Sequence, residues 1–208
     1  MQLIGMLDSP YVRRVAVSLQ LLGLPFEHRS ISVFRGFEQF RAINPVVKAP
    51  TLVCDDGGVL MDSTLILDYA EHLAAPGRSL MPSGLPERQR ELRLIGLGLA
   101  ACEKSVQIVY EHELRPAEKL HQPWLTRVTG QLLAAYAALE AELRREPLGE
   151  PMAQAGVTTA VAWRFTQAML PGVVDATDFP ALRRFSDEAE QRHEFAAAPH
   201  STLTYPVV

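Results

Sequence analysis

The segment MLDSPYVRRVAVSLQLLG, residues 6–23, decides the fold, because a short strand-like stretch gives way there to a strongly periodic helix. Ser9 is a favoured N-cap residue, and Pro10 follows it at the first helical position, which is a common helix start. The same geometry gathers a hydroxyl group, backbone N–H groups without helical partners and the positive end of the helix dipole. Anionic ligands bind at such points, so Ser9 is either a simple helix cap or part of a ligand site.

Length and composition indicate an ordinary globular protein. The chain has 208 residues, 48% of them hydrophobic and 21% charged, which is enough for one large domain or two small ones. The formal net charge of −4 argues against a nucleic-acid partner. No apolar run approaches the roughly 20 residues that a membrane span needs, and neither terminus carries a targeting signal. We therefore expect a cytoplasmic protein without a membrane partner.

Residues 1–75 mix the periods of strands and helices. The stretches at 2–7 and 26–33 are typical of short strands, with a helix between them. After an irregular or helical stretch, the segment APTLVCDDGGVLMD (49–62) predicts a β-hairpin with an Asp-Asp-Gly-Gly turn, followed by a helix. The order β-α-β, a helix or irregular stretch and β-β-α predicts a thioredoxin-like α/β domain.

The pattern changes beyond residue 75. Prolines and glycines in a polar setting mark residues 76–86 as a linker. Residues 87–208 have helical periods, which predict an all-α helical bundle domain with helices at about 157–170 and 181–194. One expected core stripe comprises Leu125, Val128, Leu132, Tyr136, Leu139 and Leu143.

A second informative segment is NPVVKAPTL, residues 44–52. Pro50 opens a strand that should be internal to the sheet, where proline is tolerated only at the first residue or at a bend. A cis Ala49–Pro50 bond would turn the chain sharply and expose the backbone N–H and C=O of Ala49 to an extended, peptide-like ligand. The alternative is an ordinary trans proline at a strand start.

A third segment is MDSTLILDYAEHL, residues 61–73. Asp62 or Ser63 is expected to cap the helix that follows. The same helix N-terminus could hold a ligand carboxylate at the backbone of Ser63, while Asp62 could pair with a ligand ammonium group.

The order of these segments resembles that of the cytosolic glutathione transferase family over essentially the whole chain. Ser-Pro-Tyr follows the first strand, Lys-Ala-Pro opens the third, Asp-Ser opens the third helix, and an all-helical half comes last. The segment SPYVRRV (9–15) is similar to bacterial branches whose first helix begins Ser-Pro-Tyr or Ser-Pro-Phe. The resemblance implies an enzyme that takes glutathione as co-substrate and adds it to a small apolar electrophile.

In this family, the residue that matches Ser9 donates its hydroxyl hydrogen to the glutathione sulfur. A free thiol has a pKa of about 8.5, and only the thiolate is a competent nucleophile. A hydroxyl donor at the sulfur, with a helix dipole behind it, lowers that pKa. We expect Asp8 or solvent to satisfy the helix cap, so that Ser9 is the catalytic residue.

The resemblance assigns the rest of the glutathione site to five residues. The backbone of Ala49 pairs with the cysteinyl part of the tripeptide, and Pro50 is cis. Asp62 and Ser63 hold the γ-glutamyl end, and Lys48 approaches the glycyl carboxylate. The electrophile is expected to lie between the domains, against Tyr11, Phe34, Val106 and Tyr110.

The chain departs from the family pattern at two places. Ala49 stands where the family has Val or Ile, and Val47 where it has Gly, but backbone pairing needs neither side chain. In GVTTAVAW, Thr158 is present and Val161 replaces an aspartate of a capping box. That loss is expected to destabilise the start of a helix by about 1 kcal/mol.

Other residues carry simpler interpretations. Arg13 and Arg14 are expected on a solvated helix face, with added positive potential at the site as the alternative. Cys54 and Cys102 lie far apart without a CxxC or His/Cys cluster, so we expect core or interface thiols and no metal. The family pattern implies a two-fold homodimer, and apolar residues outside the main stripe of the first long helix favour it: Leu94, Leu97 and Ile108.

Three alternatives remain open at this stage. Glutathione-dependent reduction of a disulfide or peroxide, or isomerisation of an activated alkene, would use the same donor site. A non-catalytic glutathione-binding or protein-interaction module would use the same scaffold. A serine hydrolase is disfavoured, because Ser9 lies outside a GxSxG motif and His28 lies on a separate predicted strand.

Overall fold

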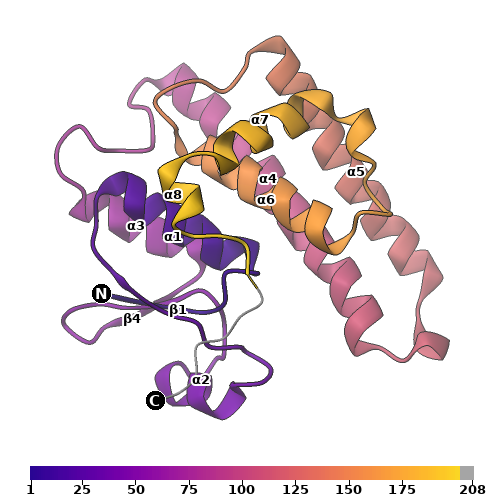
Figure 1. The fold of residues 1–208 in the computed structure, drawn as a ribbon, viewed down its shortest axis with the longest axis horizontal. Helices are drawn as coiled ribbons and strands as arrows, with labels where there is room; N and C mark the ends of the chain where they lie inside the picture. The colour runs from indigo at the N-terminus through magenta and orange to yellow at the C-terminus, as the bar shows by residue number, and fades with distance from the viewer. Residues whose placement is uncertain (202–208) are drawn as a thin grey trace. The chain divides into compact units, whose positions relative to one another are not determined.

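The computed structural model describes residues 1–201, which form two compact units. The first unit comprises Met1–Leu80 and the chain from Gln191, and the second comprises Met81–Glu190. Figure 1 labels the helices and strands. The first unit is mixed α/β and the second is helical, which confirms the predicted fold class.

The first unit is built on a four-stranded sheet with the strand order β2-β1-β3-β4. Strand β1 (Gln2–Ile4) pairs in parallel with β2 (Glu27–Arg29) and antiparallel with β3 (Thr51–Val53). Strand β3 pairs antiparallel with β4 (Val59–Met61) through the predicted hairpin. Gly57 has φ of +85° in its turn, a conformation that a residue without Cβ adopts readily.

Three helices accompany the sheet: α1 (Pro10–Leu22), α2 (Phe37–Ile43) and α3 (Ser63–Leu73). Helix α1 ends at Gly23, which has φ of +71° and donates its N–H to the carbonyl of Gln20. Helices α1 and α3 pack against each other, and a hydrogen bond from Arg14 in the first turns of α1 to Ser63 at the start of α3 shows that they begin at the same end of the unit (Figure 1).

A hydrophobic cluster connects helix α2 to the sheet. Its buried members are Ile4, Ile31 and Phe40. Partly buried side chains pack against it: Val33, Ile43, Val47, Ala49 and Val53. The loop before β3 is therefore attached to the core through two of its own side chains, those of Val47 and Ala49.

The chain from Gln191 packs on helix α1 through the short helix α8 (His193–Ala196). Arg13 donates from Nε to the carbonyl of Ala198 at 2.7 Å, and its guanidinium lies 5.6 Å from the centre of the Phe195 ring. The sequence prediction placed residues 87–208 in one helical domain, whereas this segment belongs to the first unit. A local periodic pattern shows that a segment is helical, but not which unit it packs on.

The helical unit contains four long helices and two 3₁₀ turns among its described residues. They are α4 (Leu85–Leu114), η1 (Ala117–Lys119), α5 (Gln122–Arg145), α6 (Gln154–Met169), η2 (Ala176–Asp178) and α7 (Pro180–Glu190). The predicted core stripe of α5 is buried along its whole length. Its Tyr136 hydroxyl donates to the carbonyl of Ala162 at 3.0 Å, so α5 is also fixed to α6 by a buried hydrogen bond.

Helix α4 packs against both α5 and α6, and it therefore buries more than one face. Leu94 and Ile108 are 0% and 1% exposed, and Leu97 is partly buried. The prediction that Leu94 and Ile108 form an apolar face outside the core was wrong. The prediction assumed that α4 buries one apolar stripe, but α4 packs against two helices and therefore buries apolar residues on two faces.

Helix α6 begins at Gln154, three residues before the start predicted at about residue 157. Thr158 lies inside the helix and donates its hydroxyl hydrogen to the carbonyl of Gln154. The N-terminal end is capped instead by Glu91 of α4, whose carboxylate accepts the N–H of Ala155. The expected loss of a local capping box was wrong, because the cap comes from a neighbouring helix.

Replacing Glu91 with alanine is expected to destabilise the helical unit by about 1–3 kcal/mol, because the N–H of Ala155 stays buried without its acceptor. Glu91→Gln keeps an acceptor oxygen and is expected to cost much less. Chemical denaturation at pH 7 measures both variants. Equal losses for alanine and glutamine would contradict a capping role for the acceptor oxygen.

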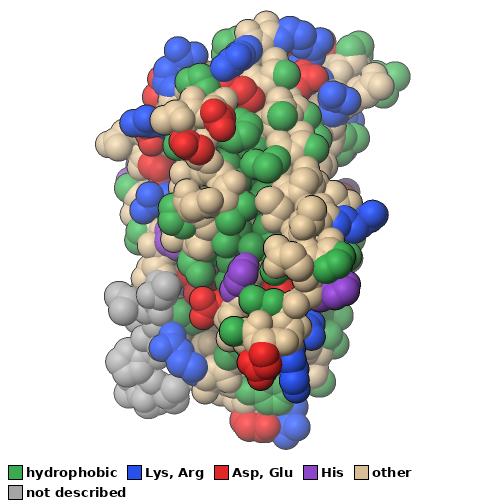
Figure 2. All heavy atoms as spheres, turned by 90° about the vertical axis from the view of Figure 1, so that its right-hand side faces the viewer, with side chains coloured by type: hydrophobic (Ala, Val, Ile, Leu, Met, Phe, Trp, Pro, Cys, Tyr) green, Lys and Arg blue, Asp and Glu red, His purple; other side chains and the backbone are tan. Residues whose placement is uncertain are grey.

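Within residues 1–201, no helix combines the length and the hydrophobicity of a membrane-spanning segment. Figure 2 shows one face of the molecule, on which Lys and Arg side chains are interspersed with Asp and Glu.

Candidate functional site

Ser9 is the N-cap of helix α1. Its Oγ accepts the N–H of Val12 at 3.4 Å, and Pro10 occupies the first helical position, as predicted. The prediction that Asp8 or solvent would replace Ser9 as the cap was wrong. A hydroxyl oxygen can accept one hydrogen bond while its hydrogen is donated elsewhere. Capping therefore leaves the Ser9 hydroxyl chemically able to donate to a ligand.

Asp8 lies next to Ser9 and is partly buried. Burial raises the pKa of its carboxyl group, and the backbone N–H of Ser9 opposes that increase. The carboxyl group is therefore easier to protonate than that of an exposed aspartate.

Gly5 brings the β1–α1 loop against the loop before β3. Its φ is +134°, a conformation that side-chain-bearing residues rarely adopt. A Cβ atom at this position would lie 2.7 Å from Cγ2 of Val12 and 3.1 Å from Cβ of Ala49. A larger residue would press on the Val12 side chain of α1 and on Ala49 in the loop before β3. Gly5 was not among the predicted site residues, although a glycine directly after a strand is a signal for close backbone approach.

The Ala49–Pro50 peptide bond is cis, which confirms the prediction from the sequence. Three residues earlier, Val47 has φ of +53°, a strained conformation for a β-branched residue. The family pattern that the sequence resembles has Gly at this position, which is the residue type that this backbone conformation favours.

Asp62 is the N-cap of helix α3, and its carboxylate accepts the N–H of Thr64 at 3.0 Å. Its φ of +74° with ψ of 124° lies outside the common regions of the backbone map. Ser63, the first residue of the helix, is buried. Asp62 and Val47 are the two non-glycine residues with positive φ among residues 1–201. Such strain is concentrated at functional sites, and here both instances flank the predicted site.

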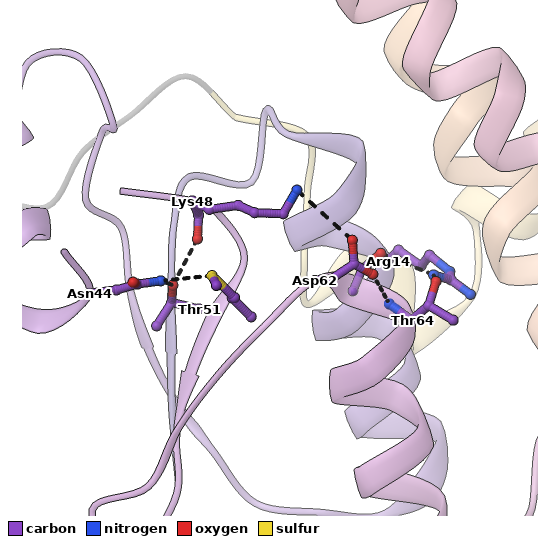
Figure 3. Close-up of polar contacts among 8 residues, drawn as sticks. Arg14, Asn44, Lys48, Thr51, Asp62 and Thr64 are labelled. Carbon is purple, nitrogen blue, oxygen red and sulfur yellow. Dashed lines mark hydrogen bonds and ion pairs between the residues drawn. The ribbon is translucent and has the colours of Figure 1, made fainter. Parts of the chain in front are cut away.

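Arg14 joins helix α1 to the start of α3. It is 2% exposed, and its Nη1 donates to the hydroxyl of Ser63 at 3.0 Å and to that of Thr64 at 3.1 Å. The side chains of Arg14 and Thr64 meet in Figure 3. The expectation of a solvated face for Arg13 and Arg14 was wrong, because α3 covers one of them and the segment from Gln191 covers the other.

Lys48 and Asp62 form an ion pair across the site, with 3.9 Å between Nζ and Oδ2 (Figure 3). Both side chains are about half exposed, so the pair adds little to stability. It nevertheless shows that the loop before β3 reaches the start of α3. Together with the contacts of Gly5 and Arg14, it brings the three loops predicted from sequence to one place.

The four residues predicted to contact the electrophile fall in different units. Tyr11 and Phe34 belong to the first unit, and Val106 and Tyr110 to the second. All four are at least partly exposed, with Phe34 at 55% and Tyr110 at 44%. Their role stays a prediction.

Cys54 and Cys102 are both buried and do not form a disulfide. No group of three or more His, Cys, Asp or Glu side chains suited to a metal ion occurs in the described part of the chain.

A family model, solved structures and a curated protein that are similar to this chain all concern glutathione S-transferases or GST-like proteins. The family model described as the N-terminal domain of glutathione S-transferase matches residues 3–79. A glutathione transferase family member from Pseudomonas fluorescens Pf-5, crystallised with S-(propanoic acid)-glutathione, is 31% identical with a TM-score of 0.81, over 95% of this chain and 98% of that one. A glutathione S-transferase from Methylobacterium radiotolerans, in complex with glutathione sulfonate, is 26% identical with a TM-score of 0.88, over 100% and 99% of the two chains. The uncharacterized GST-like protein YibF of Escherichia coli K12 is 26% identical over 200 residues, which span 94% of this chain and 96% of that protein.

Proposed function

Because the chain belongs to the glutathione S-transferase family, we propose that it binds glutathione at the three loops that meet around Ser9, Ala49 and Ser63, and transfers it to a small apolar electrophile. The observation that carries the proposal is the convergence of these loops. Gly5 lies so near Ala49 that an added Cβ would come within 3.1 Å of the Ala49 Cβ, Lys48 pairs with Asp62, and Arg14 bonds to Ser63.

The N-terminus of α3 suits the γ-glutamyl end of glutathione. The first N–H groups of a helix lack helical acceptors and carry partial positive charge, which favours a carboxylate. The Arg14 guanidinium next to the Ser63 hydroxyl adds a full positive charge beneath that point. The Asp62 carboxylate is half exposed and can pair with the ligand ammonium group.

The backbone of Ala49 extends the site toward the cysteinyl part of the tripeptide. A main-chain N–H and C=O recognise an extended peptide regardless of side chain, so Ala in place of Val or Ile leaves this function intact. Lys48 is half exposed and can turn from Asp62 to the glycyl carboxylate, because the pair that it leaves is weak.

Activation of the thiol is assigned to Ser9. Its oxygen accepts the N–H of Val12, which holds the hydroxyl group at the N-terminal end of α1. Donation of the hydroxyl hydrogen to sulfur stabilises the thiolate, and the helix dipole acts in the same direction. The thiolate then forms a carbon–sulfur bond with the electrophile, which releases its leaving group, a halide ion where the electrophile is an aromatic halide. No covalent bond to the protein is formed.

A homodimer and a cytoplasmic location stay part of this proposal. Helix α3 carries two exposed leucines that lie away from its buried face. Leu65 is 63% exposed and Leu73 is 43% exposed. Exposed apolar residues on one helix favour contact with a second copy of the chain.

The test is a titration of the purified protein with glutathione, followed by turnover with a generic aromatic halide electrophile. We expect binding in the micromolar to millimolar range and a rate that rises with pH as the bound thiol ionises. Binding without turnover would favour a non-catalytic module. Turnover only with a disulfide, a peroxide or an activated alkene would indicate a reductase or an isomerase at the same site.

A further inference from the structure

Asn44 lies at the end of helix α2 and is 4% exposed. Its Oδ1 accepts the N–H of Val46 at 3.0 Å, and its carbonyl accepts the N–H of Val47 at 2.9 Å. Its Nδ2 donates to Oγ1 of Thr51 at 2.8 Å and is 3.5 Å from Sδ of Met61. One buried amide therefore connects the start of the loop before β3 to strand β3 itself (Figure 3).

Thr51 is the next member of this chain of hydrogen bonds. It is 0% exposed, and its hydroxyl accepts from Asn44 and donates to the carbonyl of Lys48 at 2.7 Å. The hydroxyl thus has one donor and one acceptor, and its hydrogen has a defined direction. Figure 3 shows Thr51 between the side chain of Asn44 and the main chain of Lys48.

The direction of the Lys48 carbonyl determines that of the next N–H group. The C=O of Lys48 and the N–H of Ala49 belong to one planar trans peptide unit and point in opposite directions. Because Thr51 holds the carbonyl toward the strand, the N–H of Ala49 is turned the other way, out of the sheet. The cluster that holds the side chains of Val47 and Ala49 does not by itself fix the rotation of this peptide plane.

We infer that Asn44 and Thr51 are positioning residues for the bound tripeptide: their hydrogen bonds orient the Lys48–Ala49 peptide so that its N–H meets the cysteinyl carbonyl of glutathione. This inference rests on the proposed function. Both side chains are buried, so they act on the ligand through the backbone rather than by contact.

The test compares Thr51→Val with Thr51→Ser. Valine has nearly the same shape but leaves the Lys48 carbonyl without its donor, and the dissociation constant for glutathione is expected to rise about tenfold, which corresponds to about 1.4 kcal/mol. Serine retains the hydroxyl, and its dissociation constant is expected within twofold of the wild type. At saturating glutathione, the turnover number of Thr51→Val is expected to change less than its KM, since Ser9 is untouched.

Thr166→Val is the matched control. Thr166 is a buried threonine of the helical unit, with its hydroxyl 2.6 Å from that of Tyr136 and 2.7 Å from that of Ser105. We expect this variant to lower the melting temperature without changing glutathione affinity. Calorimetric titrations are made at a temperature where every variant is folded, so that a loss of stability alone does not alter the measured constant.

The possible outcomes separate the inference from the proposed function. If the wild type binds glutathione and Thr51→Val binds it equally well, the two residues have only a structural role and the inference is overturned. A wild type that does not bind glutathione overturns the proposed function, and the first titration alone reveals this. If Thr51→Val fails to fold, Asn44→Ala takes its place in the test. Its affinity for glutathione is expected to fall about threefold. An unchanged affinity would overturn the inference.

Discussion

Ser9→Ala is expected to reduce glutathione-dependent turnover at pH 7 by about 10–100-fold, and to raise the pKa that governs it by about 1–2 units. The substitution removes the hydrogen that stabilises the thiolate. Each unit of the pKa shift corresponds to about 1.4 kcal/mol of lost thiolate stabilisation. Glutathione affinity should change less, because the other loops supply most of the contacts. A pH–rate profile with one electrophile measures both quantities.

Loss of the cap must be separated from loss of catalysis, because the same oxygen accepts the N–H of Val12. Cap removal costs about 1 kcal/mol of stability. Ser9→Thr keeps a hydroxyl and is expected to retain most of the activity. Asp175→Ala removes another capping side chain, one that accepts the N–H of Thr177, and should leave the pH–rate profile unchanged. A Ser9→Ala protein with a lowered melting temperature but an unaltered profile would make Ser9 only a cap.

Arg14→Met is expected to weaken glutathione binding about 10–100-fold and to lower the free energy of unfolding by about 2–4 kcal/mol. Methionine occupies similar space but removes the charge and the hydrogen bonds to the hydroxyls of Ser63 and Thr64. The proposed ligand carboxylate then loses the positive charge that is hydrogen-bonded to the first residues of α3. Titration calorimetry and denaturation measure the two effects separately.

Arg13→Met provides the comparison for this prediction. Arg13 is the adjacent residue on α1, is equally buried, and donates to the carbonyls of Phe195 and Ala198 rather than to site residues. The Arg13→Met variant should lose stability to a similar extent while keeping its affinity for glutathione. Equal losses of affinity in the two variants would mean that the stability of α1, and not the position of Arg14, controls binding.

The sequence could predict those features that depend on local patterns. Ser9 and Pro10 form a helix start because their own backbone preferences favour one. The position of Pro50 at the start of an internal strand left both cis and trans open, and the resemblance to the family implied the cis bond that the structure has. The hairpin and the stripe on α5 follow from turn residues and from helical period.

The errors arise where a partner comes from far along the chain. Arg13 and Arg14 were assigned to solvent from residue type alone, although segments at 63–64 and 195–198 cover them. The start of α6 was misplaced because its cap, Glu91, lies 64 residues earlier. No role was predicted for Asn44 or Thr51 from the sequence, because a polar residue beside a strand has many possible roles and only its hydrogen bonds distinguish them.

The packing of residues 195–198 on α1 has a consequence for synthesis on the ribosome. Chains are made at about 5–20 residues per second, so the carbonyl acceptors of Arg13, which lie 182 and 185 residues later, are made roughly 10–40 seconds after it. During that interval, helix α1 has a guanidinium group without these acceptors. The first unit therefore reaches its final packing only after the entire helical unit has been translated, even though it holds the first residues of the chain.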